Sequence, residues 1–515
     1  MRTTARVGTA LAAVSIASAV VVATQPANAG DVGGGRSAAA AATTFNVKTF
    51  GAKGDGKAID SPAIDKAIAA ASAAPGGTVV FPAGAYLSHT IHLKSNVTLQ
   101  LNSGATVKAA TSGFDAPEAN PFSKYQDFGH SHFRNALLFG DRISNLTITG
   151  TGTIDGAGLV KTNTTPKGQA DKLLSLTRCA NVTLQTAVLR HGGHFAVLMN
   201  GCHDVLFDHF NVLSSEDRDR DGVNLVNTWN VEVSHSTIQG TDDGLSFKSD
   251  FALGQTFPSH HIRVHDSTIL STKNNAIQFG VESCGDFSDA TFTNITIPGA
   301  GKAGIGIVSL DGAHISDIHF TGITETQVSS PVFIRLGGRG SCPGSPPPGS
   351  ISGVTIDGLT GTHLTTPRPV QGAPEYTGTI VGSPGANISD ISLTNVDLTV
   401  PGGHPVSDAS VTPPEGLTLY RPREFGTRPA YGFWLRHVAR VTFTNVLVHS
   451  DKPDGRPAYA VDDGSIVRWL SSKVQASTGP VDFRVNNVNG YQLLQCTTTS
   501  GGVPRVKATG SVGLP

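Results

Sequence analysis

Short segments in which apolar and polar residues alternate recur every 23 to 36 residues between residues 145 and 324, and further such segments follow. A period of two is typical of a β-strand with one buried face. No long amphipathic helix pattern separates these segments, so a sheet of β–α–β units is disfavoured. Strand pairs that return at this period predict a β-solenoid that continues to about residue 490. The repeats occupy residues 145–156, 181–190, 204–213, 230–238, 261–270, 289–297, 315–324, 351–361, 388–398 and 438–450.

Asparagine recurs where the alternation breaks, often in Asn-X-Thr triplets. Asparagine tolerates the left-handed backbone conformation that tight bends require, and stacked asparagines can form ladders. We therefore interpret the triplets as coil turns rather than as glycan sites.

Two other patterns interrupt the repeats. Residues 60–73 predict one amphipathic helix, which we expect to cap the open N-terminal end of the solenoid. The Pro/Gly-rich segments 342–349 and 411–429 break coils without the length to form a domain. We expect them to be surface loops that wall a cleft.

The N-terminus has the composition of an export signal. Residues 1–29 combine two early arginines, an apolar run and small residues at the end, which predicts a secretory signal peptide and an extracellular protein. No second apolar stretch of about 18 residues appears later in the sequence, so we do not interpret this run as a membrane anchor. We expect residues 30–43 to be a disordered Gly/Ala/Ser-rich segment and residues 44–515 to form one β-helix domain.

Charge and cysteine content narrow the picture further. A net charge of −1 argues against nucleic acid or a membrane surface as a partner. Five cysteines in an exported chain permit disulfides, with one left over. Cys179 and Cys202 lie about one coil apart and are the best candidate pair, although two reduced buried cysteines explain the spacing nearly as well.

Three aspartates have the spacing of one coil. Asp242 and Asp243 follow Asp221 by twenty-one residues or slightly more. Neighbouring coils of a solenoid lie about 4.8 Å apart, so these carboxylates should share one small surface. Carboxylates this close raise at least one pKa, so that one group can act as an acid and its neighbours as bases. Solvated turn aspartates are the structural alternative, but the coil spacing favours catalysis of glycoside hydrolysis.

Several motifs resemble glycoside hydrolase family 28, the polygalacturonase and rhamnogalacturonase family of right-handed parallel β-helices. FGAKGDG at 50–56 is similar to the family's N-terminal cap, and GTGTIDG at 150–156 is similar to the phrase that opens its coils. The family's Asn-X-Asp and Asp-Asp motifs fall on 219–221 and 242–243. The resemblance covers about residues 44–490 and implies an all-β right-handed parallel β-helix with an N-terminal capping helix.

The resemblance also implies catalytic roles for the three aspartates. Asp242 would be the general acid, while Asp221 and Asp243 would activate water, so that hydrolysis inverts the anomeric carbon. Two family motifs are missing. The family histidine is replaced by Asn275, and its Arg-X-Lys motif, which grips a galacturonate carboxylate, aligns with residues 306–308, Gly-Ile-Val. The chain is most similar to a bacterial branch of the family whose substrate grip is built differently.

Seven residues are candidates for substrate binding on position in the coils or on the resemblance. Lys248 follows Asp243 by five residues, but strand alternation does not decide which aspartate it faces. Arg335 and Arg339 could supply the missing carboxylate grip, with a surface salt bridge as the alternative. The other candidates are His194, Arg220, Asn275 and Glu282, and for His194 and Glu282 a structural role is an open alternative.

We expect an exported monomeric hydrolase that acts on a pectic polysaccharide, of polygalacturonan or rhamnogalacturonan type, without a cofactor. We expect no metal site either, because the histidine pair His130 and His132 has no further ligand at a recognisable spacing and is better placed to line a substrate subsite. A polysaccharide lyase on the same scaffold is one alternative, although no base is evident beside the carboxylates. A non-catalytic carbohydrate-binding solenoid is another.

Overall fold

The computed structural model describes residues 43–515 except 75, 126–128, 163, 216–218 and 366–375. The predicted signal peptide and all but the last residue of the predicted disordered segment lie outside the described residues. The residues from 42 onward form one compact unit. Among the described helices, none has the length and apolar character needed to cross a membrane.

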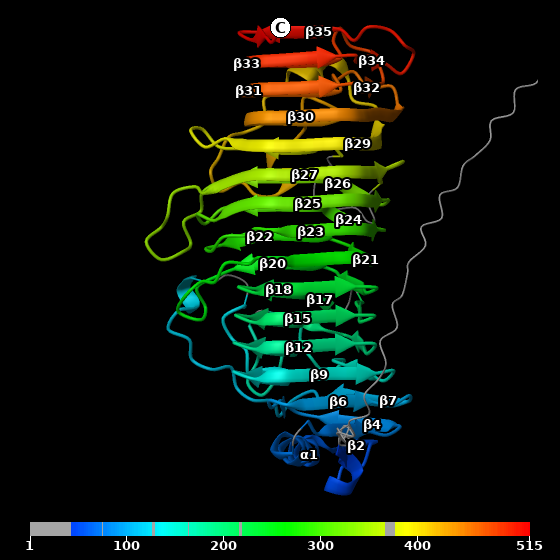
Figure 1. The fold of residues 1–515 in the computed structure, drawn as a ribbon, viewed down its shortest axis with the longest axis vertical. Helices are drawn as coiled ribbons and strands as arrows, with labels where there is room; N and C mark the ends of the chain where they lie inside the picture. The colour runs from blue at the N-terminus through cyan, green and yellow to red at the C-terminus, as the bar shows by residue number, and fades with distance from the viewer. Residues whose placement is uncertain (1–42, 75, 126–128, 163, 216–218, 366–375) are drawn as a thin grey trace, which may run out of the picture. The chain divides into compact units, whose positions relative to one another are not determined.

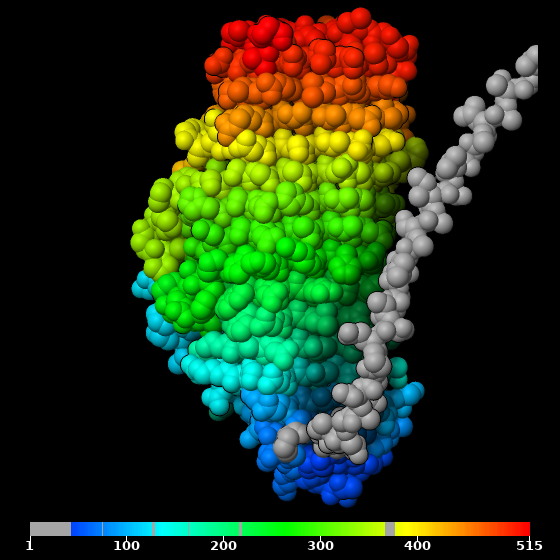
Figure 2. All heavy atoms as spheres, viewed as in Figure 1, coloured from blue at the N-terminus to red at the C-terminus, as the bar shows by residue number. Residues whose placement is uncertain are grey.

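The predicted solenoid is a right-handed parallel β-helix, in which each coil pairs in parallel with the next (Figure 1). Figure 2 shows the coils as successive bands, each formed by the next stretch of sequence. Three runs of strands, here called sheets A, B and C, line the sides of the coil. The strands continue to Val512–Gly513, past the predicted end near residue 490.

Sheet A carries the residues of interest. Its strands are β5 (Ile91–His92), β8 (Ala136–Asp141), β11 (Lys172–Thr177), β14 (Gly193–Asn200), β17 (Asp219–Val226), β20 (Leu245–Ser249), β22 (Ile277–Ser283), β24 (Ala300–Ser309), β26 (Val328–Leu336), β28 (Gly378–Val381), the first part of β30 (Phe433–Lys452), β31 (Tyr459–Leu470), β33 (Phe483–Leu494) and β35 (Val506–Thr509).

Sheets B and C merge after the first half of the chain, because single long strands then serve both. Sheet B comprises β1 (Thr44–Asn46), β3 (Thr78–Phe81), β6 (Val97–Leu101), β9 (Ser144–Gly150), β12 (Ala180–Gln185), β15 (His203–Asp208), β18 (Trp229–Ser234), β21 (Ile262–Ser271), β23 (Ala290–Ile297), β25 (His314–Glu325), β27 (Ser350–Gly361), β29 (Ile388–Gly402) and β36 (Val512–Gly513), with parts of β30, β31 and β33. Sheet C comprises β2 (Asp55–Ile59), β4 (Gly84–Ser88), β7 (Ala105–Ala109), β10 (Thr153–Asp155), β13 (Val188–Arg190), β16 (Asn211–Leu213), β19 (Thr237–Gly240), β32 (Lys473–Val474) and β34 (Thr497–Thr498).

Left-handed residues form the bends into sheet B, as the asparagine pattern predicts. Asn145 and Asn181 have φ of 56° and 53°, a conformation that asparagine adopts at low cost. Asn181 Nδ2 donates to Asn145 Oδ1 and Asn145 Nδ2 to Asn96 Oδ1, each at 2.7 Å. These side chains therefore form the expected ladder along the solenoid.

The interior is filled by apolar side chains that stack from coil to coil. Phe247 and Phe279 stack with ring centroids 5.0 Å apart, and Phe292 and Phe320 stack at 4.7 Å. Parallel coils place equivalent positions above one another, so equal side chains at equal positions meet face to face.

The predicted capping helix is α1 (Ser61–Ala73), at the N-terminal end of the stack (Figure 1). Its buried stripe of Ile64, Ala67, Ile68 and Ala71 has helical spacing and shields the first coil. Short 3-10 helices lie outside the sheets at Val47–Phe50, Ser123–Tyr125, Val406–Ser410 and Pro422–Phe425.

Cys179 and Cys202 are disulfide-bonded, with Cα atoms 4.4 Å apart, which confirms the predicted pair. A second disulfide joins Cys284 to Cys342 and attaches the Pro/Gly-rich segment 342–349 to the end of β22. Cys496 is the remaining free cysteine.

Candidate active site

Strand register brings the three aspartates together. β17 pairs with β20 so that Val223 lies beside Leu245, and the Gly222 amide donates to the Asp243 carbonyl at 2.9 Å. The same register, two residues earlier, places Asp221 beside Asp243, and Arg220 beside Asp242. The side-by-side arrangement expected from the coil spacing is therefore present.

All three aspartates line one pocket on sheet A. The pocket also contains Lys248 from β20 and the side chains of the two coils that follow. Its lining residues are His194, Arg220, Asp221, Asp242, Asp243, Lys248, Asn274, Asn275, Gln278, Val281, Glu282, Lys302, Tyr420 and Arg421.

Lys248 lies at the buried base of the pocket, among carboxylates. Its Nζ is 3.2 Å from Asp243 Oδ2, 3.6 Å from Glu282 Oε2 and 3.9 Å from Asp221 Oδ2. Burial lowers the pKa of Lys248, but Glu282 and then the aspartates more than offset this and hold the pKa above its usual value. Lys248 therefore faces Asp243 as a permanent cation, which settles the orientation that alternation left open.

Asp242 has a different environment from its two neighbours. Arg220 Nη2 lies 2.5 Å from Asp242 Oδ2, and the Asn274 amide donates to the other oxygen. Although burial raises its pKa, the positive charges of Lys302 and Arg220 lower the pKa of Asp242 to about 2. Asp242 is therefore ionised at neutral pH beside these two cations.

Asp221 and Asp243 are more deeply buried and hold protons more readily. Burial, followed by the charge of Asp242, raises the pKa of Asp221 well above its ordinary value. Burial also raises the pKa of Asp243, opposed by Lys248. A proton shared among the three carboxyls thus favours Asp221 and Asp243 over Asp242, so the acid role that the resemblance implies for Asp242 needs a change of charge when substrate binds.

Two candidate polar residues line the pocket as neutral groups. Burial, with the charge of Arg220, lowers the pKa of His194 to about 2, so its imidazole is neutral. Asn275 holds the position of the family histidine, but its amide is already engaged. Its Oδ1 accepts from the Ala303 amide at 3.0 Å, and its Nδ2 donates to Gln278. It is therefore held in place by the next coil.

His130 lies behind the pocket, next to the carboxylates at its base. Its Nδ1 is 3.6 Å from Glu282 Oε1 and its Nε2 is 3.4 Å from Lys248 Nζ. Glu282 is thereby held between two basic groups, 3% exposed. His132 instead contacts the Glu118 carbonyl and does not line the pocket.

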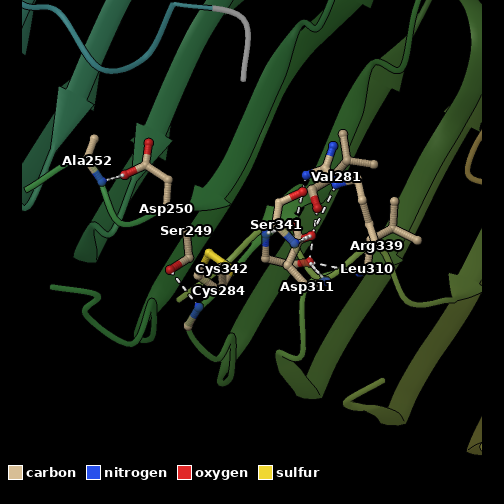
Figure 3. The surroundings of a disulfide bond; sticks show 12 residues. Ser249, Asp250, Ala252, Val281, Cys284, Leu310, Asp311, Arg339, Ser341 and Cys342 are labelled. Carbon is tan, nitrogen blue, oxygen red and sulfur yellow. Dashed lines mark hydrogen bonds and ion pairs between the residues drawn. A yellow bond between two sulfur atoms is a disulfide. The ribbon is translucent and has the colours of Figure 1, made fainter. Parts of the chain in front are cut away.

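Arg335 and Arg339 do not line the pocket, so the expectation that they grip a substrate carboxylate there is wrong. Arg335 is 2% exposed and donates to backbone carbonyls, including Leu419 at 2.8 Å and Gly416 at 2.7 Å. Arg339 forms a paired contact with buried Asp311, at 3.1 and 2.7 Å. Figure 3 shows this pair beside the Cys284–Cys342 disulfide.

The strand pattern alone did not identify five polar lining residues as candidates: Asn274, Gln278, Lys302, Tyr420 and Arg421. Lys302 precedes the Gly-X-Gly-X-Val run of β24, and its offset of twenty-eight residues from Asn274 is the length of one coil. That coil length could have pointed to Lys302. Tyr420 and Arg421 come from the loop 411–429, which was expected to wall a cleft, but no sequence signal gives a loop's path.

Two clusters in the described part of the chain bring three possible metal ligands within 4.8 Å of one another, and neither contains a pocket residue. They are Asp208 with His209 and His235, and Glu415 with His437 and Asp463. Both include side chains open to solvent.

The chain is similar to a rhamnogalacturonase/epimerase family model and to polygalacturonases. The family model "Rhamnogalacturonase A/epimerase, pectate lyase-like" matches residues 44–280, which include the three aspartates. A polygalacturonase of Malus domestica is 28% identical over 319 residues, covering 59% of this chain and 64% of the apple protein. The chain therefore spans less than two thirds of that relative.

Two solved structures share the fold. The exopolygalacturonase of Thermotoga maritima superposes with a TM-score of 0.60 at 16% identity, over 79% of this chain and 91% of that one. The family 28 exopolygalacturonase of Yersinia enterocolitica gives 0.57 at 16% identity, over 90% of this chain and 79% of that one. At this identity the likeness establishes the fold.

Proposed function

We propose that this chain, a protein similar to glycoside hydrolase family 28 with the pectin-lyase fold, is a secreted glycoside hydrolase that cleaves a pectic polysaccharide. The observation that carries the proposal is the set of three aspartates on neighbouring coils within one pocket. Carboxylates with distinct environments are the machinery of glycoside hydrolysis. The similarity to polygalacturonases supports a uronate-rich substrate.

The proposed chemistry divides the carboxylates by environment. Asp242 is partly exposed at the pocket mouth, so it can reach the glycosidic oxygen and protonate it. Asp221 and Asp243 are buried beside Lys248, which favours their ionised forms when Asp242 holds the proton. One or both would then take a proton from the attacking water, on the opposite side of the sugar.

Binding of an acidic substrate would prepare this arrangement. Lys302 and Arg220 are the groups that keep Asp242 ionised. A substrate carboxylate placed against either cation would offset its positive charge, and the pKa of Asp242 would rise toward the range of a useful acid.

The test is a substrate screen with the purified chain. Polygalacturonan, rhamnogalacturonan and a neutral glucan would be incubated separately, with reducing ends counted and products sized. We expect reducing ends from one of the two pectic polymers and none from the glucan. Ultraviolet-absorbing unsaturated product would indicate elimination instead. Binding of a pectic polymer without any cleavage would indicate a binding solenoid.

A further inference from the structure

We propose that Lys302 and Arg421 bind the carboxylate of a uronate residue in the pocket, in place of the cations that the Gly306-Ile307-Val308 segment lacks. This inference rests on the proposed function and identifies what gives the site its specificity for acidic sugars. Two independent features lead to it: an ammonium that has no close partner among the described residues, and a fixed loop that brings a guanidinium to the same pocket.

Lys302 occupies the same position of the coil as the proposed acid, Asp242. The Lys302 amide donates to the Asn274 carbonyl at 2.9 Å, and the Asn274 side chain donates to Asp242. The three residues therefore occupy successive coils at one position of sheet A. Register confirms this, because Leu245 pairs with Ile277, and Ile277 with Ile305.

The ammonium of Lys302 is available to a ligand. Within the described residues, its Nζ forms no hydrogen bond and no carboxylate oxygen lies within 4.0 Å of it, although Asp242 and Asp243 act on it at longer range. Burial lowers the pKa of Lys302 below its usual value, as expected of a cation removed from water without a close counter-ion. An anion in the pocket would supply that counter-ion.

Arg421 is brought to the same pocket by the loop 411–429. Its guanidinium lies 4.5 Å from the ring centroid of Tyr420 and donates to the Tyr420 hydroxyl, so the side chain is held against a flat surface. A weak ion pair of 3.6 Å joins it to Glu424. About a third of the side chain is exposed, which leaves donors of the five-donor guanidinium for a ligand.

The loop that carries Arg421 is fixed from below by Arg335. That buried guanidinium binds the carbonyls of Gly416 and Leu419, just before Tyr420. A preorganised cation loses little conformational entropy when it binds an anion, so more of the interaction energy contributes to affinity. The arginine expected to hold the substrate thus instead holds the segment that we propose does so.

The geometry also explains why β24 carries no cation at Gly306. A Cβ atom built on Gly306 would lie 2.8 Å from Gln278 Oε1 and 3.2 Å from Asn275 Cγ. The two amides already fill the space through which an arginine side chain would have to pass. Among the described residues, positive charge reaches this part of the pocket from Lys302, near the start of β24, and from the loop 411–429.

The experiment compares Lys302→Met and Arg421→Met with Lys273→Met, an exposed lysine one residue before Asn274 that does not line the pocket. Galacturonate and galactose would be titrated separately into each protein by calorimetry. We expect each pocket variant to weaken galacturonate binding by about 10- to 100-fold, the usual range for a charge-assisted hydrogen bond, and to leave galactose unchanged. Lys302→Arg should restore part of the loss, and Lys273→Met should match the wild type.

Steady-state kinetics and the pH profile of activity distinguish carboxylate binding by Lys302 from a purely structural role, which would not change the pH profile. On a uronate polymer, Lys302→Met should raise KM and reduce kcat/KM, and its pH profile should lose less activity on the basic side, because Asp242 no longer has that cation beside it. If both pocket variants bind galacturonate as the wild type does, the inference is wrong. If the wild type cleaves no uronate polymer, the proposed function fails, and the galacturonate titration still decides the inference separately.

Discussion

Asp242 and Asp243 are adjacent in the sequence but differ in proton affinity, because their side chains have different surroundings. Asp242 is held by Arg220 and Asn274 at the pocket mouth, whereas Asp243 is buried against Lys248. We expect Asp242→Asn to fold normally and to lower turnover by at least about 100-fold, since loss of a general acid removes roughly 10²–10⁴ in rate. Circular dichroism and reducing-sugar release should be measured on the same sample.

The chain contains a matched control for that substitution. Asp463 belongs to a second Asp-Asp pair, outside the pocket, and its side chain accepts from Asn487. Asp463→Asn should keep wild-type turnover. Comparable losses in both variants would mean that the Asp242 effect is structural.

Asp221 should destabilise the folded protein at neutral pH, because its buried carboxyl has a higher pKa in the folded chain than in the unfolded chain. The unfolded chain ionises near pH 4 and the folded chain at higher pH, so the folded state loses stability as pH rises between these values. Asp221→Asn removes that cost. We expect it to abolish activity yet to raise the free energy of unfolding at pH 7 by about 0.5–2 kcal/mol, within the usual range for stabilising substitutions.

The check is denaturant unfolding of wild type and Asp221→Asn between pH 3.5 and 8. The difference should be near zero at the acidic end and should grow to a plateau above the folded-state pKa. A variant that is less stable at pH 7 would show that Asp221 is instead held ionised by Lys248 in the native state.

At the scale of single elements, the loop 411–429 depends on one arginine. Arg335 satisfies four backbone carbonyls, those of Val381, Gly382, Gly416 and Leu419. Arg335→Met would remove this donor from all four carbonyls, although that of Gly416 would keep the Leu419 amide at 3.2 Å. The cost is about 1–3 kcal/mol for each carbonyl that is left without a donor and that water cannot reach. We expect a loss of at least about 3 kcal/mol in stability and a higher KM, because Tyr420 and Arg421 lose their fixed position.

Unfolding and steady-state kinetics would be compared with those of Arg440→Met. Arg440 is an exposed arginine that pairs with Asp390 on the solenoid surface, and its loss should matter little. Unchanged stability in Arg335→Met would show that the loop is held by its other contacts.

At the scale of the whole molecule, the coil spacing sets the stereochemistry we expect. Adjacent coils are about 4.8 Å apart, and side chains that diverge from neighbouring strands extend this toward the roughly 6.5–9.5 Å that admits a water between acid and base. The first product should therefore have the inverted anomeric configuration, visible by proton NMR of fresh digests. A retained anomer would mean that one aspartate attacks the sugar directly.

The sequence by itself determined the solenoid, its capping helix and the meeting of the three aspartates. Each follows from a local period: alternation gives strands, asparagine gives bends, and the repeat length gives the offset at which Asp221 meets Asp243. The helix was predicted over 60–73 and spans Ser61–Ala73. Because every coil repeats the geometry of the previous one, the repeat length in the sequence predicts which residues lie side by side on neighbouring coils.

Only the tertiary structure decided which cations serve the pocket. Arg335 lies on β26 and Arg339 follows that strand, as the repeat predicts. However, the Arg335 guanidinium donates to backbone carbonyls and Arg339 pairs with Asp311, so neither is available to the pocket. Lys302 reaches the pocket from the irregular start of β24, where the register shifts between Ala300 and Ala303, and Arg421 reaches it from a loop. A repeat length fixes where a regular strand residue lies, but the direction of a side chain beside a register shift, and the path of a loop, depend on packing against segments far away in the chain.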